Sequence, residues 1–273
     1  MKQLIGILLF TLFVGTTFAQ DIQQKNVPAV VLNAFQIKFP NASDVDWRLE
    51  KGNYRIKFEV NNKDNKLVLD DRGKLMKHEQ DLWESEIPVS VLETVKSKVA
   101  FFDLNDADKL VEGSKTIYSI NFEIDKRDHD FLLDGKGKLL SYEKELKDSE
   151  VPISITNIIK NKYGELDIDD ADYKEKNGKI NYQLKGEIND KDHSFLFDEK
   201  GTVLKHQQDL RNDEIPAAIR TTLKTSFNGF EIRDADLLEE RSSAFYELSL
   251  RKSKEKIHVI FNPLGKVQEV KKD

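Results

Sequence analysis

The sequence predicts an α+β protein made of four tandem units of about 64 residues, each one helix followed by a meander of antiparallel strands. Two observations lead to this fold class. Marker residues recur along the chain at one spacing, and within each copy the apolar pattern changes from a helical period to a period of two. The markers spaced by 64 are Tyr54, Tyr118, Tyr182 and Tyr246, together with Gly73, Gly137, Gly201 and Gly265.

Residues 1–19 have the features of a signal peptide. A positively charged start precedes an apolar run from Leu4 to Val14, and small residues lead up to Ala19. A membrane anchor is the alternative, but a spanning helix needs about 20 apolar residues and this run stops at Gly15. We therefore expect cleavage after Ala19, and a periplasmic or secreted protein of a Gram-negative bacterium with no membrane span after signal cleavage.

The first element expected in each copy is a helix that follows an Ile-Pro or Val-Pro pair. Proline is tolerated in the first turn of a helix, because the N–H that it lacks would have no partner there. Apolar residues then fall at helical spacing, as in Val91, Leu92, Val95 and Val99 of the second copy. Each helix therefore has one apolar stripe to bury. The prolines are Pro28, Pro88, Pro152 and Pro216.

The strands follow with alternating side chains. In the first copy Tyr54, Ile56 and Phe58 face one way, while the residues between them are polar. We expect the apolar face of the sheet to be covered by the helix and the polar face to meet water. The polar face that a partner could meet is predicted to contain Arg55, Lys57, Glu59, Asn121, Glu123, Asn181, Gln183, Lys185, Glu187, Glu247 and Arg251.

A tight turn ends at each marker glycine. An Asp or Asn three residues earlier can accept backbone hydrogen bonds, and glycine can adopt the left-handed conformation that closes a type I turn with a G1 bulge. Asp70, Asp134, Asp198 and Asn262 are therefore predicted to be structural. The first copy is expected to be shorter than the others by two residues in its helix and two in its first turn.

Acidic residues recur at the start of the first strand, and they raise the question of a metal. The repeated pairs are Asp44/Asp46, Asp106/Asp108, Asp170/Asp172 and Asp234/Asp236. The densest run, with Asp167, Asp169, Asp170 and Asp172, offers the hard oxygen ligands that calcium prefers. It is not an EF-hand, because the glycine at the sixth position is missing and Gly178 stands where the twelfth-position glutamate belongs. We interpret these residues as a solvated start of the strand, with calcium as the alternative.

The sequence contains no catalytic or cofactor motif, so no enzyme, cofactor or metal site is predicted. His129 and His193 occupy equivalent places in different copies, as do His78 and His206, so they cannot easily share one ion. His193 beside Asp192 could in principle act as a base, but we interpret it as a surface residue. Trp83, between the first two copies, is interpreted as a buried plug rather than an exposed anchor.

Composition excludes several classes of protein. The 43 Lys and Arg residues against 49 Asp and Glu residues give a formal charge of −6, which argues against a binder of nucleic acid or of an anionic membrane. The absence of cysteine rules out disulfides, a thiolate zinc site, a cysteine nucleophile and a lipidated N-terminal cysteine. Stability must therefore come from packing.

The chain resembles the PepSY-like, beta-lactamase-inhibitor-protein-like periplasmic proteins of Gram-negative bacteria. The resemblance is carried by Phe39-Pro40-Asn41-Ala42-Ser43-Asp44-Val45-Asp46-Trp47, Tyr54-Arg55-Ile56-Lys57-Phe58 and Leu69-Asp70-Asp71-Arg72-Gly73-Lys74-Leu75. It is strongest in copy one, because the later copies have Lys109, Tyr173 and Leu237 in place of Trp47. It implies sheets side by side with helices on one face, and no catalysis. The inhibitor that gives the family its name binds a protein through its sheet, but no inhibitory contact residue can be matched here.

These observations predict a non-enzymatic binding or scaffold protein of the cell envelope, with another envelope protein or a peptide as partner and inhibition of a hydrolase as a special case. The alternative is a structural spacer or a calcium-dependent matrix element. Residues 20–147 are expected to hold units one and two, and residues 148–273 units three and four. The polar face is mostly charged and lacks the central aromatic or arginine cluster of a binding face, so a merely solvated sheet is the other reading.

Overall fold

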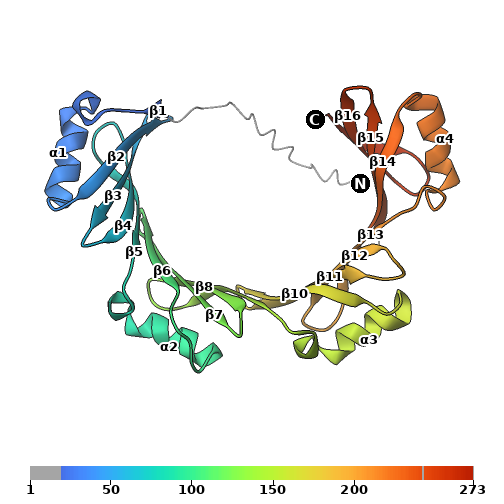
Figure 1. Cartoon of the computed structure of the whole chain (residues 1–273), viewed down its shortest axis with the longest axis horizontal. Coiled ribbons are helices and arrows are strands. Elements are labelled where there is room, and N and C mark those ends of the chain that lie inside the picture. Colours follow the sequence, from blue (N-terminus) through green and yellow to red (C-terminus); the bar gives the residue numbers. More distant parts are fainter. Residues whose placement is uncertain (1–19, 242, 273) are drawn as a thin grey trace, which may run out of the picture. The chain divides into compact units, whose positions relative to one another are not determined.

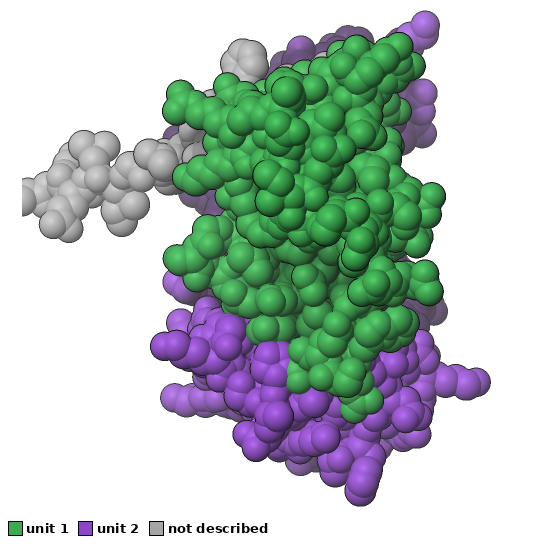
Figure 2. Space-filling view, turned by 90° about the vertical axis from the view of Figure 1, so that its left-hand side faces the viewer, with its two compact units in different colours: residues 1–87, 106–118 green, residues 88–105, 119–273 purple. Residues whose placement is uncertain are grey.

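The computed structural model describes residues 20–241 and 243–272. The expected signal peptide, residues 1–19, lies outside the described residues. The chain divides into two compact units, which Figure 2 draws in green and purple. Of the described residues, unit 1 contains 20–87 and 106–118, and unit 2 contains 88–105, 119–241 and 243–272. None of the helices formed by the described residues is both long enough and apolar enough to cross a membrane.

Each of the four α-helices is followed along the chain by four strands. The helices are α1 (Ala29–Lys38), α2 (Val89–Lys98), α3 (Ile153–Lys162) and α4 (Ala217–Ser226). After a short β1 (Gln20–Asp21), the strands are β2 (Ser43–Glu50), β3 (Asn53–Val60), β4 (Lys63–Leu69), β5 (Leu75–Asp81), β6 (Asp106–Glu112), β7 (Lys115–Ile124), β8 (Arg127–Asp134), β9 (Leu139–Glu145), β10 (Asp167–Lys176), β11 (Lys179–Glu187), β12 (Asp192–Asp198), β13 (Val203–Asp209), β14 (Glu231–Glu240), β15 (Ser243–Lys252), β16 (Glu255–Phe261) and β17 (Val267–Lys272). The prediction of an α+β fold built from repeated helix-and-strand segments is confirmed.

The expected prolines lie one residue before each helix rather than inside its first turn. Pro28 has φ −55° and ψ 139°, which is not a helical conformation, so the helix begins at Ala29. The carbonyl oxygen of Pro28 accepts a hydrogen bond from the N–H of Val31 at 3.0 Å. Proline therefore acts as the N-cap residue, whose carbonyl accepts the first helical bond while its own backbone stays extended.

A capping glutamate precedes three of the helices. Glu86, Glu150 and Glu214 each accept a hydrogen bond from the backbone N–H three residues earlier, at 2.8 Å in every case. The first two close the 3₁₀ turns η2 (Glu84–Glu86) and η3 (Asp148–Glu150), while η1 (Gln24–Asn26) precedes α1 without such a bond. The 64-residue spacing of these glutamates is a sequence signal that our sequence analysis missed.

Unit 1 is an antiparallel sheet of strands β1 to β6 in chain order, with α1 on one face (Figure 1). Its core packs around Phe35 of α1. The ring of Phe35 lies 5.2 Å from Trp47 and 5.0 Å from Phe58, both in edge-to-face geometry. Aromatic pairs of this kind add to the free energy of burying the rings.

Unit 2 is a longer antiparallel sheet in which β8 to β17 pair in chain order and β7 lies next to β8. Helices α2, α3 and α4 lie on the same face of it (Figure 1). Under α3 the core contains Ile155, Ile159, Leu184 and Phe195. The core under α4 is centred on Ile219, Leu248, Val259 and Phe261.

The turns at the marker glycines have the predicted geometry. The side chain of Asp70 accepts backbone hydrogen bonds from Arg72 at 2.9 Å and Lys74 at 2.8 Å, and Gly73 has φ +77°. The same bonds recur at the other three turns. A side chain at Gly137 would in addition collide with the carbonyl group of Ser90 in α2. The glycine therefore allows both the turn and the close approach of the helix.

The shortening of the first copy lies elsewhere than expected. All four helices have ten residues. The difference lies in the first hairpin: from the pair Trp47/Ile56 to the turn, each strand of the β2–β3 hairpin is two residues shorter than the β10–β11 hairpin is from the pair Ala171/Leu184 to its turn. Trp47 pairs with Ile56, and Ala171 pairs with Leu184 in the same way, so Trp47 matches the alanines of the other copies. The assignment of Lys109, Tyr173 and Leu237 to the Trp47 position is therefore wrong.

Candidate protein-binding face of the sheet

In each unit the helices cover one face of the sheet, and we call the opposite face the open face. In unit 1 Arg55, Lys57 and Glu59 project from β3 onto it, because Ile56 and Phe58 between them are buried on the helix side. Paired residues of an antiparallel sheet share a face, so the register extends this surface to β2, β4 and β5. The row through Lys57 runs Asp46, Lys57, Lys66, Glu79 and Leu110.

The other eight residues predicted for the polar face lie on the open face of unit 2. They project from three strands, with Asn121 and Glu123 on β7, Asn181, Gln183, Lys185 and Glu187 on β11, and Glu247 and Arg251 on β15. The structure does not bring these three groups into one cluster, since β12, β13 and β14 separate β11 from β15.

Ion pairs neutralise part of the open face. Arg55 Nε lies 2.6 Å from Glu50 Oε2, and Lys66 Nζ lies 2.6 Å from Glu79 Oε1. In unit 2, Lys185 Nζ lies 2.8 Å from Asp170 Oδ2. Exposed pairs of this kind contribute about 0 to 1 kcal/mol each, so they order the surface more than they stabilise the fold.

The strands between β11 and β15 carry residues that our sequence analysis missed. The row through Lys185 continues across Ser194, Gln207, Leu238 and Phe245. Leu238 and Phe245 are half-buried and give the open face an apolar spot among charged side chains. The alternation of Tyr246, Leu248 and Leu250 toward the core could have placed Phe245 on the other side.

A hollow of about 520 Å³ adjoins this row. It is lined on the open face by Asp170, Lys185, Asp192, Ser194, Gln207 and Asp209. Flat sheet faces offer little shape to a partner, so a hollow next to an apolar spot gives this part of the open face a shape that a partner could recognise. Its walls carry more carboxylates than amines.

Each helix and the four strands that follow it form one segment, and the last strand of a segment pairs with the first strand of the next. Carboxylates face each other at these pairings. The paired residues are Asp81/Asp108, Glu145/Asp172 and Asp209/Asp236. Burial, followed by the charge of Asp106, raises the pKa of Asp108 to about 6. Burial likewise raises the pKa of Asp236 to about 6. Like charges directly opposite in a sheet are destabilising, so these positions hold unfavourable charge at neutral pH.

The copy-one counterpart of these pairs is an ion pair. Asp21 of β1 faces Arg48 of β2, with Arg48 Nε 2.9 Å from Asp21 Oδ1. Arg48 takes the place of Asp172 in the register, because Arg48 pairs with Arg55 as Asp172 pairs with Gln183. The expectation of a solvated start of the strand holds for Asp106 and Asp234, which are exposed. It fails for Asp108, Asp172 and Asp236, which are half-buried and whose pKa values are raised chiefly by burial.

Four histidines, His78, His129, His193 and His206, are buried on the helix side, whereas His258 of β16 lies on the open face. His193 is 6% exposed, and its Nδ1 lies 3.0 Å from Nε2 of His206. His206 Nδ1 contacts Glu239 Oε2 at 2.8 Å. The interpretation of His193 as a surface residue beside Asp192 is therefore wrong. It failed because we compared only equivalent positions, whereas the two partners lie 13 residues apart on adjacent strands.

The same diagonal pair recurs in other copies. His78 Nε2 lies 3.0 Å from Asn65 Oδ1, and His129 Nδ1 lies 2.9 Å from the hydroxyl oxygen of Tyr142. Burial lowers the pKa of His78 to about 4, and it lowers the pKa of His193 to about 4 as well. These histidines are therefore neutral core groups near pH 7. In the last copy the two positions hold Ile257 and Val270.

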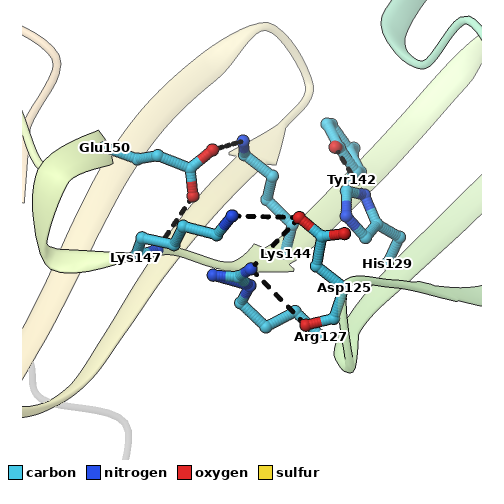
Figure 3. A network of polar contacts seen from close by, with 7 residues as sticks. All are labelled: Asp125, Arg127, His129, Tyr142, Lys144, Lys147 and Glu150. Atoms are coloured by element: carbon cyan, nitrogen blue, oxygen red, sulfur yellow. Dashed lines mark hydrogen bonds and ion pairs between the residues drawn. The ribbon is translucent and has the colours of Figure 1, made fainter.

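A polar network links β9 and η3 to the turn between β7 and β8 (Figure 3). Lys147 Nζ lies 2.9 Å from Asp125 Oδ2, and Arg127 Nη2 lies 3.7 Å from the same oxygen. The hydrogen bond from the Lys147 backbone lowers the pKa of Glu150, and the bond from the Lys147 side chain lowers that of Asp125. The network joins the capping turn η3 to the hairpin of β7 and β8, and we interpret it as a structural contact.

Trp83 and the acidic run of β10 are the remaining residues that the sequence analysis singled out. Trp83 is 57% exposed, so its interpretation as a buried plug is wrong. In the acidic run of β10, Asp170 pairs with Lys185 and the strand contains a bulge between Ile168 and Asp170. Across residues 20–241 and 243–272, no group of three or more His, Asp or Glu side chains is arranged to hold a metal ion.

Comparisons with known proteins identify one family. The family described as "Putative beta-lactamase-inhibitor-like, PepSY-like" matches residues 17–77, 131–205 and 202–269. No curated protein matches the chain. Among solved structures, the chain is similar to one described as a putative periplasmic protein from Bacteroides eggerthii, with 17% identity and a TM-score of 0.37 over 43% of this chain and 88% of that one. It is also similar to a BLIP-like protein from Bacteroides fragilis, with 17% identity and a TM-score of 0.36 over 46% of this chain and 93% of that one.

Proposed function

Because this chain belongs to the PepSY-like, beta-lactamase-inhibitor-like family, we propose that it is a non-enzymatic, exported protein of the cell envelope that binds another protein through the open face of its sheet. The family supports a protein-binding role in the periplasm. The proposal includes four tandem units of about 64 residues, grouped as residues 20–147 and 148–273, behind a signal peptide cleaved after Ala19. Blocking a hydrolase is a special case of this function.

One observation carries the proposal. All helices of each unit lie on one face, so the other face presents its side chains without a covering layer (Figure 1). In unit 2 that face combines the apolar spot of Leu238 and Phe245 with the adjoining hollow. An aromatic or apolar anchor surrounded by polar groups is the usual composition of a protein-binding surface.

The charge of the open face supports a basic partner segment. Facing carboxylates at Asp209/Asp236 lie close to the hollow, and Asp209 itself lines it. A lysine or arginine brought near them would relieve the repulsion between the two carboxylates. Association would then be faster at low ionic strength, because complementary charge steers the encounter.

The test uses the mature protein as bait in extract from its native envelope. Phe245→Glu and Lys185→Glu alter the proposed surface, while Asn161→Glu alters an exposed residue of α3 and serves as the matched control. We expect a partner that is retained by the wild type and by Asn161→Glu and lost with Phe245→Glu, provided that all variants keep the wild-type circular dichroism. Equal retention by Phe245→Glu and the wild type would exclude the apolar spot of unit 2 as the binding surface.

A further inference from the structure

β17 forms the end of the unit 2 sheet. Its register partners are on β16, and among the described residues of unit 2 no second strand pairs with its other edge. An unpaired edge presents backbone N–H and C=O groups that can accept another strand. Such an edge can bind a partner, or its side chains can prevent binding. The side chains of β17 decide between these outcomes.

The apolar residue at the centre of β17 is exposed where its counterparts are buried. Val270 pairs with Val259 on the helix side and is 45% exposed. The equivalent residues on β5, β9 and β13 are His78, Tyr142 and His206, at 8%, 5% and 1% exposure. Each of these is covered because a further strand pairs with its own. A strand added to β17 would cover Val270 in the same way.

We propose that β17 pairs antiparallel with β17 of a second copy of this chain, about a two-fold axis at Val270. In this register Glu269 of one copy lies opposite Lys271 of the other, and the same pair forms again by symmetry. Glu269 and Lys271 both project onto the open face, since they pair with Ile260 and His258 of β16. The two valines meet on the helix side.

The charges of β17 select this register. Directly opposed residues must share a face of the sheet. A shifted register must therefore move by two residues at a time, because a shift by one residue would place the side chains on the wrong face. One such slip places Glu269 opposite Glu269 of the second copy, and the other places Lys271 opposite Lys271. Like charges directly opposite destabilise a strand pair, whereas opposite charges stabilise it. The register centred on Val270 is therefore the one in which both charges are matched.

The free edge of unit 1 does not offer β17 an equally good partner. On β2, Leu49 and Arg48 are already paired with Gln20 and Asp21 of β1, and Asp21 forms an ion pair with Arg48. A head-to-tail contact would have to displace β1, which is part of the same chain and so is present at a high effective concentration. Head-to-tail contacts also form larger rings or open chains, whereas the two-fold contact closes at two copies.

The test is analytical ultracentrifugation of the mature protein and its charge variants. We expect a monomer–dimer equilibrium with no larger species. Glu269→Lys or Lys271→Glu alone should weaken the dimer about tenfold or more, because each change makes both cross-strand pairs repulsive. The double variant exchanges the charges and should restore the dissociation constant to within about threefold of the wild type.

Lys256→Glu is the matched control, because it reverses an exposed charge on β16 that does not lie at the edge. It should leave the dimer unchanged. The proposal is overturned if the wild type stays monomeric up to about 1 mM, if the mass continues to rise beyond two copies, or if the double variant is as weak as the single ones. Circular dichroism checks that each variant folds.

Discussion

At the scale of single residues, adding a side chain at a marker glycine has two costs, backbone strain and collision with a neighbouring residue, and two equivalent glycines differ in the second. Gly137 and Gly201 both have positive φ, at +82° and +81°. A Cβ atom at Gly201 would meet only the flexible end of Ile158, at 3.2 Å, whereas at Gly137 it would collide with the backbone carbonyl of Ser90. The two positions therefore share the backbone strain and differ in the space available.

Alanine at these two positions should separate the costs. Gly201→Ala should lower the free energy of unfolding by about 1 kcal/mol, the cost of a left-handed conformation for an L residue. Gly137→Ala should lower it by about 2 to 4 kcal/mol, because overpacking against α2 adds to that strain. Urea unfolding followed by circular dichroism measures both. Equal losses would mean that α2 does not approach the turn as described.

The facing carboxylates give a pH-dependent prediction. The pKa of Asp108 is raised to about 6 in the folded protein, above its value in the unfolded chain. A raised pKa favours the protonated folded state, so the stabilising contribution is present at low pH and is lost as the pH rises through about 6. Asp108→Asn should therefore be more stable than the wild type by about 1 kcal/mol near pH 7.5, after allowance for solvent screening.

This advantage of Asp108→Asn should shrink as the pH falls below about 6 and disappear near pH 4, where the carboxyl group is protonated in both the folded and the unfolded state. The lowered pKa values of His78 and His193 act in the opposite direction, because their contribution is lost as the pH falls from about 6.5 toward 4. Both proteins contain these histidines, so their contribution cancels when the stability of the variant is compared with that of the wild type. Thermal unfolding at several pH values measures it, with Asp71→Asn in an exposed turn as control. An advantage that does not change with pH would refute the carboxylate repulsion.

At the scale of elements, the diagonal polar pairs fix how β12 and β13 meet under α3. His206 contacts both His193 and Glu239, so removing it leaves the buried His193 and the half-buried Glu239 without this partner. His206→Val should cost about 1 to 3 kcal/mol. The double variant His193→Ile, His206→Val copies the fourth copy and should cost less than the single variant. A double variant with the larger loss would show that the apolar pair cannot replace the polar one here.

The elements themselves follow from local patterns in the sequence. The helical stripe that contains Val91 and Val95 predicts α2, and the alternation around Ile56 predicts β3. The Asx turns at Asp70 and its counterparts can be predicted from the sequence, because the hydrogen bonds and the left-handed glycine that define each turn lie within five consecutive residues. These features depend on near neighbours, which is why the sequence predicts them.

Contacts across strands could not be predicted in the same way. The pairing of Asp209 with Asp236 and of His193 with His206 depends on the register between strands, which a single sequence leaves open. The difference between Arg48 and Asp172 was hidden for the same reason, since the shorter hairpin of the first copy shifts its residues. The exposure of Trp83 also required the tertiary structure.

At the scale of the whole molecule, the two faces of each sheet differ in composition. The helix side of each sheet holds the apolar core and the neutral histidines, while the open face holds charged rows, facing carboxylates and the apolar spot at Phe245. The helices cover one face of each sheet and leave the other face uncovered. A binding function predicts that contacts with the partner come from the uncovered face alone.

Site-specific photo-crosslinking in the native envelope tests this claim most directly. A photoreactive phenylalanine analogue would replace Lys57 in unit 1 and Gln183 in unit 2 on the open face, with Gln36 of α1 and Asn161 of α3 as exposed helix-side controls. We predict a covalent adduct with one envelope protein from Lys57, Gln183 or both, and none from the two helix positions. Adducts confined to Gln36 and Asn161, or absent from all four positions, would contradict the account.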